Sequence, residues 1–167
     1  ALLLDAWALL DRPTLPAAEE SLRRWLGAAA LVVPGSEGGR VVLAGAPLHA
    51  TVPAVEALVR WDPAWFAQRE LDERCGLSLP PAVRVATLTG RRALVEAGVR
   101  ELDLPPPAAV LGPLPRGGDD TWRTVLTVPA EHGLDLAREL AALRARASAR
   151  KEPHPVTVRV DPPDPTA

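Results

Sequence analysis

Residues 122–147 read WRTVLTVPAEHGLDLARELAALRARA, and this stretch decides which fold the chain adopts. The β-branched alternation over 122–128 predicts a strand. Leu136, Leu140 and Leu143 then recur at helical spacing among polar residues, which predicts an amphipathic helix over 134–147. Because an amphipathic helix must bury its apolar stripe against another element, we expect this helix to pack on a sheet.

The segments before and after this strand and helix are predicted to form further strands and a helix, in an order that is typical of a known fold. Strands are predicted over 83–88, 109–111 and 156–160, a helix over 91–99, and loops over 104–107 and 113–120. The order β-α-β-β-α-β is that of the ferredoxin-like split βαβ arrangement, an antiparallel sheet with two helices on one face. We therefore predict an α+β domain of this type over residues 82–167.

The first half of the chain has a different organisation. Residues 2–4 are predicted as a buried strand, 17–31 as a helix and 40–44 as a second strand, which resembles the last piece of an α/β sheet. The apolar face of the helix holds Leu22, Trp25, Leu26 and Ala29. Two further helices, over 52–61 and 64–75, form a predicted connector over 47–81 that Gly76 and Pro80-Pro81 end. The predicted domains are thus 1–46, 47–81 and 82–167.

The composition excludes several classes of protein. Hydrophobic residues make up 47% of the 167 residues and charged residues 24%, which excludes wholesale disorder. A net charge of −2 argues against a strongly basic nucleic-acid coat protein, although a local basic patch is compatible with it. The single cysteine, Cys75, excludes an internal disulfide and a multi-cysteine zinc module. Residues 1–5 lack the features of a signal peptide or membrane span, so we expect a cytoplasmic chain cut from a longer protein, with no membrane partner.

The residues that commonly carry catalysis are scattered. His49, His132 and His154 lie far apart, and none has a second ligand at metal-binding spacing. Residues 35–40 are rich in glycine but lack the Gly-Lys-Ser/Thr ending of a phosphate-binding loop. Neighbouring carboxylates on a helix point to different sides, which disfavours paired acid–base chemistry. We therefore predict no catalytic residue, no metal and no cofactor in this chain.

The basic residues carry the strongest functional signal. They gather at the end of the last predicted helix, and further arginines lie near the predicted strands. With a tryptophan as a stacking platform for an unpaired base, they could line one surface that binds nucleic acid. The alternative is a solvated helix face beside an ordinary core tryptophan. The predicted DNA-binding residues are Arg84, Arg91, Arg92, Trp122, Arg123, Arg144, Arg146, Arg150 and Lys151.

Short matches along nearly the whole chain resemble the primosomal replication-restart protein N′ (PriA) family. In chain order they are Leu4-Asp5, Arg12-Pro13, Ala17-Ala18-Glu19, Asp62, Phe66, Glu70-Leu71, Arg74, Pro80-Pro81, Val110-Leu111-Gly112-Pro113-Leu114-Pro115 and Val158-Arg159-Val160-Asp161-Pro162. The resemblance implies that residues 1–46 are the tail of the second, RecA-like helicase lobe and that the C-terminal domain follows. It also implies zinc and ATP sites upstream of this stretch.

The segment after Ala17-Ala18-Glu19 departs from the helicase members of the family. Those members carry a Gln followed by Gly-Arg-Ala-Gly-Arg, whose arginines reach the ATP phosphates. Here Gly27 lies near the Gln position, and Leu31 and Pro34 lie near the two arginines. The chain therefore resembles the degenerate, helicase-inactive type. Helicase members also bind a partner's tail with basic residues near the start of the last long helix, whereas residues 130–135 here contain no Lys or Arg.

The resemblance implies a role in replication restart. The leading interpretation is non-catalytic recognition of stalled forks, branched or single-stranded DNA by a nucleoid-associated protein. That protein would scaffold primosome reassembly with single-stranded-DNA-binding protein and the machinery that loads the replicative helicase. Two alternatives stay open: an active ATP-dependent 3′–5′ DNA helicase whose final arginine is supplied elsewhere, and a protein-interaction module without DNA contact. Whether the chain belongs to a working enzyme is therefore open.

Overall fold

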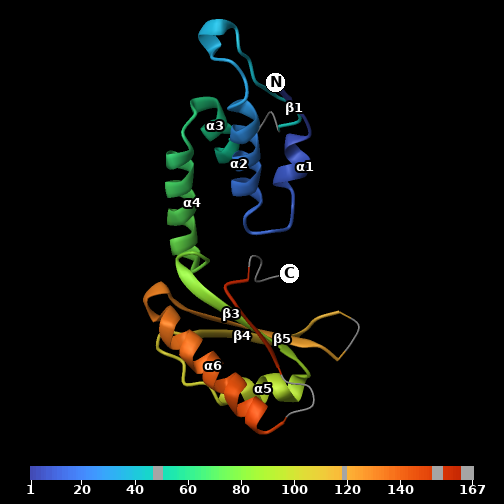
Figure 1. Ribbon diagram of the computed structural model, residues 1–167, viewed down its shortest axis with the longest axis vertical. Helices are drawn as coiled ribbons and strands as arrows, with labels where there is room; N and C mark the ends of the chain where they lie inside the picture. Colours follow the sequence, from blue (N-terminus) through green and yellow to red (C-terminus); the bar gives the residue numbers. More distant parts are fainter. Residues whose placement is uncertain (47–50, 118–119, 152–155, 163–167) are drawn as a thin grey trace. The chain divides into compact units, whose positions relative to one another are not determined.

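The structure is a computed structural model that describes residues 1–46, 51–117, 120–151 and 156–162 (Figure 1). It is mixed α/β with two sheets. The chain divides into two compact units, an N-terminal unit of Ala1–Glu73 and a C-terminal unit that begins at Arg74.

The N-terminal unit is helical apart from one small parallel sheet. The two strands pair with Leu2 opposite Val42 and Leu3 opposite Leu43. A short helix between the first strand and the predicted helix was not expected from the sequence. The elements are β1 (Leu2–Leu3), α1 (Ala6–Leu10), α2 (Ala17–Ala29), η1 (Gly35–Glu37), β2 (Val42–Leu43), α3 (Pro53–Arg60) and α4 (Pro63–Leu77), the last of which runs into the C-terminal unit.

Local signals explain where α4 begins, but the predicted end is wrong. The carboxylate Oδ1 of Asp62 accepts a hydrogen bond from the backbone N–H of Trp65 at 2.9 Å, which is the predicted N-cap. Gly76 does not stop the helix, which continues through Leu77. Ser78 adopts the left-handed conformation instead, with φ at 52°. The backbone N–H of Leu79 then donates to the carbonyl of Arg74, which closes the helix end.

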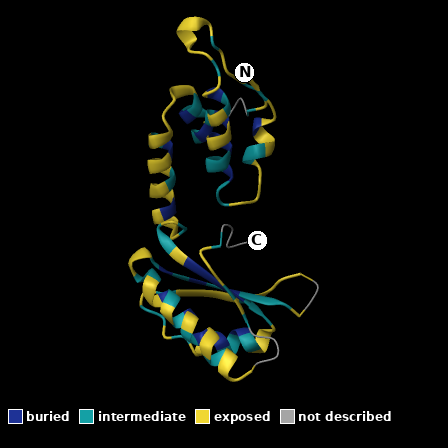
Figure 2. Ribbon diagram, viewed as in Figure 1, coloured by how far each residue is buried: buried dark blue, intermediate teal, exposed yellow. Residues whose placement is uncertain are grey.

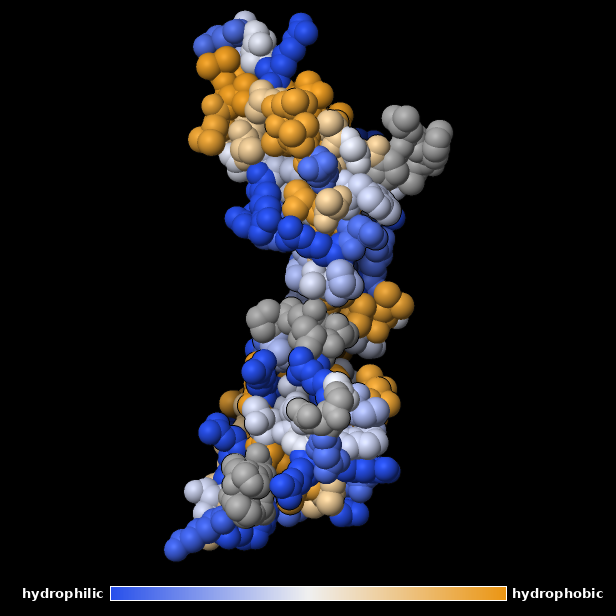
Figure 3. Space-filling view, turned by 90° about the vertical axis from the view of Figure 1, so that its right-hand side faces the viewer, coloured by the Kyte–Doolittle hydropathy of each residue, from blue (hydrophilic) through white to orange (hydrophobic). Residues whose placement is uncertain are grey.

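The core of the N-terminal unit forms where α2 meets α1, α3 and α4. Trp25 is 2% exposed, and it packs with Ala6, Leu22, Ala54, Ala57 and Phe66, which confirms the predicted apolar face of α2. The predicted burial of the first strand is wrong, because Leu2 and Leu4 are exposed and only Leu3 reaches the core. Alternate side chains of a strand point to opposite sides, and no described element covers Leu2 and Leu4. Figure 3 shows apolar side chains at the surface of this unit.

The C-terminal unit contains a four-stranded sheet and two main helices. The strand order is β4-β5-β3-β6, and every neighbouring pair is antiparallel. The element order is the β-α-β-β-α-β order expected from the sequence. The elements are β3 (Val83–Gly90), α5 (Arg92–Arg100), β4 (Ala109–Pro115), β5 (Trp122–Pro129), η2 (Ala130–His132), α6 (Gly133–Ala149) and β6 (Thr157–Val160).

Strand β4 is longer than its sequence predicts. Gly-Pro reads as a turn, so the strand was expected to end at Leu111, but pairing with β5 resumes at Leu114 after an irregularity. Gly112 makes this possible with a φ of 108°, and a Cβ there would lie 2.7 Å from the carbonyl oxygen of Arg123. A side chain at this position would thus collide with the neighbouring strand.

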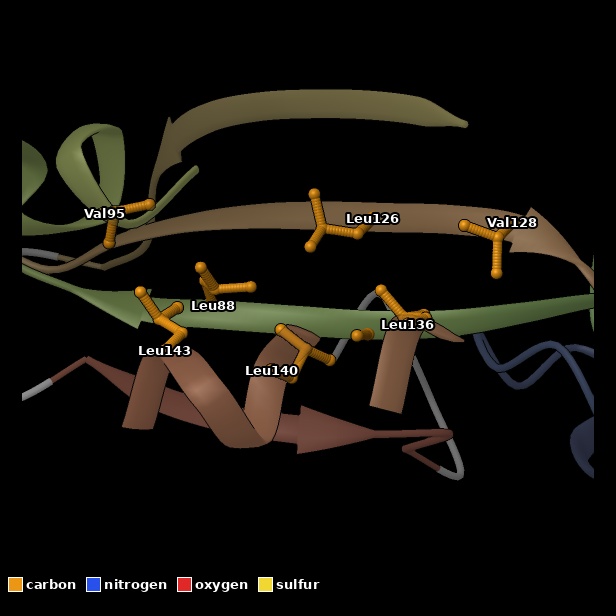
Figure 4. Close-up of a cluster of buried hydrophobic side chains, with 8 residues drawn as sticks. Leu88, Val95, Leu126, Val128, Leu136, Leu140 and Leu143 are labelled. Carbon is orange, nitrogen blue, oxygen red and sulfur yellow. The ribbon is translucent and has the colours of Figure 1, made fainter. Parts of the chain in front are cut away.

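Helices α5 and α6 pack on one face of this sheet (Figures 1 and 4). The buried side chains in the contact are Ala86, Leu88, Val95, Leu126, Val128, Leu136, Leu140 and Leu143. Figure 2 shows buried residues along the strands and on the inner sides of the helices. The two helices meet at Gly98, where a Cβ would lie 3.6 Å from the Leu143 side chain and 3.5 Å from that of Leu88, at ordinary van der Waals distance. The predicted inward face of the last helix is therefore confirmed.

Replacing Trp25 with alanine should lower the free energy of unfolding of the N-terminal unit by about 3–5 kcal/mol, because a buried aromatic side chain leaves a cavity. Trp7, which is 52% exposed, is the matched control, and Trp7→Ala should change stability by no more than about 0.5 kcal/mol. Urea unfolding followed by circular dichroism measures both. Equal small effects would show that Trp25 is not a core residue.

Thr124 offers a second test of the packing, because its side chain is fully buried and its Oγ1 has no hydrogen-bond partner among the described residues. Thr124→Val keeps the shape and removes an unsatisfied hydroxyl, so the free energy of unfolding should stay level or rise by about 1 kcal/mol. Ser21 is the contrast, since its buried Oγ donates to the Ala17 carbonyl at 2.7 Å. Ser21→Ala should lower stability by about 1 kcal/mol. If Thr124→Val lowered the free energy of unfolding by about as much as Ser21→Ala, this account would be contradicted.

Candidate functional site

A groove of about 760 Å³ lies in the C-terminal unit between α5, α6 and β6, and we call it the α5–α6 groove. Small and aliphatic side chains from all three elements form its apolar lining, and charged residues form its rim. The apolar lining consists of Leu94, Ala97, Gly98, Leu143, Ala147, Val156 and Val158. The rim consists of Glu101, Arg144, Arg150 and Lys151.

The helical spacing of α6 places one set of side chains along this groove. Arg144, Ala147, Ser148 and Lys151 follow one another at steps of three, one and three residues, so they share one side of the helix and its end. The backbone N–H of Lys151 donates to the carbonyl of Ser148 at 3.0 Å. Lys151 has a φ of 52°, a left-handed conformation that turns the chain away from the helix axis at the rim.

The rim carboxylate is already neutralised within the structure. Glu101 accepts from Nε of Arg146 at 3.3 Å and pairs with Nη2 of Arg150 at 3.3 Å. Nη2 of Arg146 also donates to the backbone carbonyl of Glu101 at 3.2 Å, which ties the end of α5 to α6. Arg144 and Lys151 form no ion pair within the described part of the chain. Taken over its described residues, the rim therefore carries a net positive charge, and two of its cations, Arg144 and Lys151, are exposed.

Trp122 and Arg123 do not share one surface, contrary to the sequence-based expectation. Successive residues of β5 point to opposite faces of the sheet, so Trp122 lies on the face that α5 and α6 cover. The guanidinium of Arg92 lies 4.8 Å from the centre of its ring, and Nε1 of Trp122 donates to Oδ1 of Asp120 at 3.1 Å. One ring face is therefore occupied by a cation rather than open to a base.

The other predicted residues lie outside the α5–α6 groove. Arg84 pairs with the Asp161 carboxylate at 3.2 Å, whose other oxygen accepts from the backbone N–H of Val85. Arg91 is exposed at the N-cap of α5. The structure thus brings together Arg144, Arg146, Arg150 and Lys151 around Glu101, and it separates Arg84, Arg91, Arg92, Trp122 and Arg123 from them.

Sequence reasoning missed Glu101 and the apolar lining of the groove. The small residues Ala97 and Gly98, next to each other in a predicted helix, were the available signal, because small side chains let another element approach or leave space. Their partners on α6 and β6 are about 45 to 60 residues away in sequence. Only the folded chain brings these segments together.

Neither a metal cluster nor a membrane-crossing helix is found in the described ranges. No group of three or more His, Cys, Asp or Glu side chains there is arranged to hold a metal ion. No helix of those ranges has the length and apolar character needed to cross a membrane. Cys75 is a free, exposed thiol. His49 and His154 lie outside the described residues.

In the N-terminal unit, the two arginines of α2 that precede Leu31 and Pro34 in the sequence are engaged by a carboxylate of the same helix. Nε of Arg23 and Nε of Arg24 each lie 2.7 Å from the carboxylate of Glu20. Hydrogen bonds from Arg23 and then Arg24 lower the pKa of Glu20 to about 2. Leu31 itself is 88% exposed, so its side chain contributes no charge and little packing at this position.

The fold and groove define a segment of two α/β units, the second carrying a small antiparallel sheet domain with a basic-rimmed groove. The sequence model of the Primosomal protein N C-terminal domain family matches residues 76–163. Over 97% of its length the chain is 41% identical to the probable replication restart protein PriA of Mycobacterium leprae (strain TN). It is 40% identical to that of Mycobacterium tuberculosis (strain ATCC 25618 / H37Rv), again over 97% of the chain. The chain belongs to the PriA family, and it spans 26% and 27% of the length of these two relatives.

Proposed function

We propose that this chain serves replication restart by binding stalled forks, branched or single-stranded DNA without driving unwinding. In this proposal it also scaffolds primosome reassembly, with single-stranded-DNA-binding protein and the helicase-loading machinery as partners. Membership of the PriA family supports the restart role, since the relatives are named replication restart proteins. The observation that carries DNA contact is the rim of the α5–α6 groove, where Arg144 and Lys151 are exposed and form no ion pair in the described residues.

The finer fold assignments belong to this proposal. We assign the C-terminal unit to the ferredoxin-like split βαβ class, which the antiparallel order β4-β5-β3-β6 and the two helices on one face support. We assign residues 1–46 to the tail of a RecA-like lobe, which the parallel pairing of β1 and β2 supports. The connector over 47–81 then contains α3 and α4.

Electrostatics set the expected strength of DNA binding. Arg144 and Lys151 can each meet a phosphate directly, whereas Arg150 shares its charge with Glu101. Two or three phosphate contacts give a slope of log affinity against log salt of about −1.5 to −2.5. The net charge of −2 for the whole chain opposes tighter binding. Affinity should therefore be micromolar or weaker, as for non-specific contacts.

The absence of ATP-driven unwinding is proposed from the N-terminal unit. Leu31 and Pro34 are apolar, so they cannot stabilise the negative charge that develops on a transferring phosphoryl group. Arg23 and Arg24 are held by Glu20 at 2.7 Å. Any zinc or ATP site of the whole protein would lie in its upstream part, as the family resemblance implies.

The DNA contact is tested with the double substitution Arg144→Ala and Lys151→Gly. Glycine suits the left-handed backbone at 151, and Arg146 and Arg150 remain in place to hold Glu101, so the fold should be retained. Fluorescence anisotropy with a labelled forked DNA over a salt series measures affinity and slope. We expect the affinity for the fork to fall and the magnitude of the salt slope to decrease by about 1.5.

The matched control is Arg138→Ala, which removes another exposed arginine of α6 that pairs with Asp135 and does not line the groove. It should bind the fork as the parent does. A double variant with the parental affinity and salt slope would show that the rim is only a solvated helix end. The interaction-module alternative would then replace the DNA-binding proposal.

The proposed absence of ATP-driven unwinding is tested by the ATP turnover of the full-length protein. The full-length protein, mixed with forked DNA, should release phosphate at a rate well below about 1 s⁻¹, the low end of ordinary enzyme turnover. A steady-state phosphate-release assay with and without the fork measures this. DNA-stimulated turnover at or above that rate would support the active-helicase alternative, with its final arginine supplied from elsewhere.

A further inference from the structure

We propose that the corner between α3 and α4 docks a basic segment of a partner protein, with an arginine or lysine of that segment stacked on the indole of Trp61. We call this surface the Trp61 corner, and it consists of Val59, Arg60, Trp61 and Asp62. The corner lies within the N-terminal unit. The inference goes beyond the proposed function, because no part of it depends on DNA binding at the α5–α6 groove.

Trp61 adopts a backbone conformation that its side chain disfavours. Its φ of 57° and ψ of 41° are left-handed. The backbone N–H of Asp62 donates to the carbonyl of Ala57 at 2.9 Å, and the N–H of Trp61 donates to that of Leu58 at 3.2 Å. These are the two hydrogen bonds of a Schellman motif, in which glycine usually takes the left-handed position because a Cβ is strained there. A tryptophan at this position therefore weakens the end of α3.

Burial does not compensate for this strain. Trp61 is 56% exposed, and Val59 close by is 80% exposed. Figure 2 shows the turn between α3 and α4 as exposed. Strained backbone conformations gather at functional sites, and tryptophan is enriched among the residues that contribute most to protein interfaces. The strain and the exposure together indicate a residue retained for a partner.

A neighbouring tryptophan shows which group an indole at this surface accepts. The guanidinium of Arg60 lies 5.5 Å from the centre of the Trp65 ring, and that of Arg69 lies 6.0 Å from it. Both distances are in the range of a cation–π contact. The ring of Trp61 has no such contact within the described ranges, so its exposed indole can accept a cation that a partner supplies.

The charge of the two helices favours a basic partner. Residues 53–77 contain five carboxylates and three arginines, a net charge of −2. Arg60 pairs with Glu56, and Arg69 pairs with Glu73 at 3.1 Å, so these arginines are neutralised by carboxylates of their own helices. A basic segment is therefore attracted to this surface, whereas a polyanion such as DNA is repelled.

Asp62 supplies a carboxylate next to the exposed indole. Its Oδ1 accepts a hydrogen bond from the backbone N–H of Trp65 at 2.9 Å, and it forms no ion pair with any described residue. An arginine or lysine of a partner thus finds an indole and a carboxylate on two consecutive residues. This combination favours a basic protein segment over an unpaired base, because the phosphate of a nucleotide would lie near an anion.

The test is an anisotropy titration of the chain with the fluorescein-labelled peptide GRAGRAGR at physiological salt. The control peptides are GQAGQAGQ, which lacks the charge, and GEAGEAGE, which reverses it. We expect GRAGRAGR to bind at least about tenfold more tightly than either control. Equal binding of GRAGRAGR and GQAGQAGQ would overturn the docking proposal.

Trp61→Gly is the decisive variant, because glycine suits the left-handed backbone and removes the indole. It should weaken binding of GRAGRAGR about tenfold, while the thermal midpoint of unfolding stays level or rises. Trp7→Ala removes another exposed indole of the same unit and should bind the peptide as the parent does. Parental affinity in Trp61→Gly would show that the indole is dispensable, and a clearly lower thermal midpoint would show that it is structural. Either result overturns the proposal.

Asp62→Asn tests the carboxylate without removing the helix cap. Asparagine caps a helix as well as aspartate does, so the hydrogen bond to the backbone of Trp65 should be kept while the charge is lost. Binding of GRAGRAGR should weaken about threefold, and circular dichroism verifies that the variant is folded. Peptide affinity equal to that of the parent would contradict the role of charge at this corner.

A labelled oligothymidylate is the probe for the competing ligand. If it binds the parent chain and loses more affinity than the peptide in Trp61→Gly, the corner stacks a base and the docking proposal is overturned. The double variant Arg144→Ala with Lys151→Gly should bind GRAGRAGR as the parent does. The peptide titration therefore stands or fails independently of DNA binding at the α5–α6 groove.

Discussion

The contact between Leu143 of α6 and Gly98 of α5, over Leu88 of the sheet, is the constraint on which the proposed functional surface depends. A Cβ at position 98 would lie 3.6 Å from the Leu143 side chain and 3.5 Å from that of Leu88, so the three residues pack at ordinary van der Waals distance. Full burial of a leucine side chain stabilises a fold by about 1.5–3 kcal/mol relative to leaving it exposed. The packing of Leu143 therefore holds α6 in its position on the sheet. The α5–α6 groove begins at the same two residues, which both line it.

The position of α6 in turn decides which of its cations are free to act. Glu101, at the end of α5, engages Arg146 and Arg150 and leaves Arg144 and Lys151 without an ion pair among the described residues. Exposed ion pairs of this kind contribute little stability, on the order of 0–1 kcal/mol each. Their consequence is chiefly positional, because Arg146 and Arg150 are held against Glu101 at the end of α5, whereas Arg144 and Lys151 stay exposed at the groove.

Regular periodicity explains what the sequence predicted well. The leucines of α6 recur at helical spacing and lie in the core, and Asp62 caps α4 as its place before Pro63 indicated. The sequence-based predictions failed where the local conformation depends on residues that are close in space and not only on the local sequence. Gly76 was read as a helix end, but the left-handed turn falls at Ser78, since a glycine permits that conformation without requiring it.

The candidate site was predicted only in part for the same reason. The charges at the end of α6 are local in sequence, so their clustering was visible. The pairing of Glu101 with Arg146 joins residues 45 positions apart, and no pattern in either segment reveals it. Trp122 and Arg123 were placed together because they are neighbours in sequence, whereas the two-residue period of a strand sends them to opposite faces.

The measurement that tests the central claim most directly is a titration of forked DNA into the isotopically labelled chain, followed by the Nε–Hε resonances of its arginines. The account predicts that Arg144 shifts most and that the amides of residues 97–101 and 144–151 shift with it. Arg91, Arg92 and the indole of Trp122 should stay in place. Shifts centred on those three side chains, with residues 144–151 unchanged, would contradict the assignment of the α5–α6 groove as the functional surface.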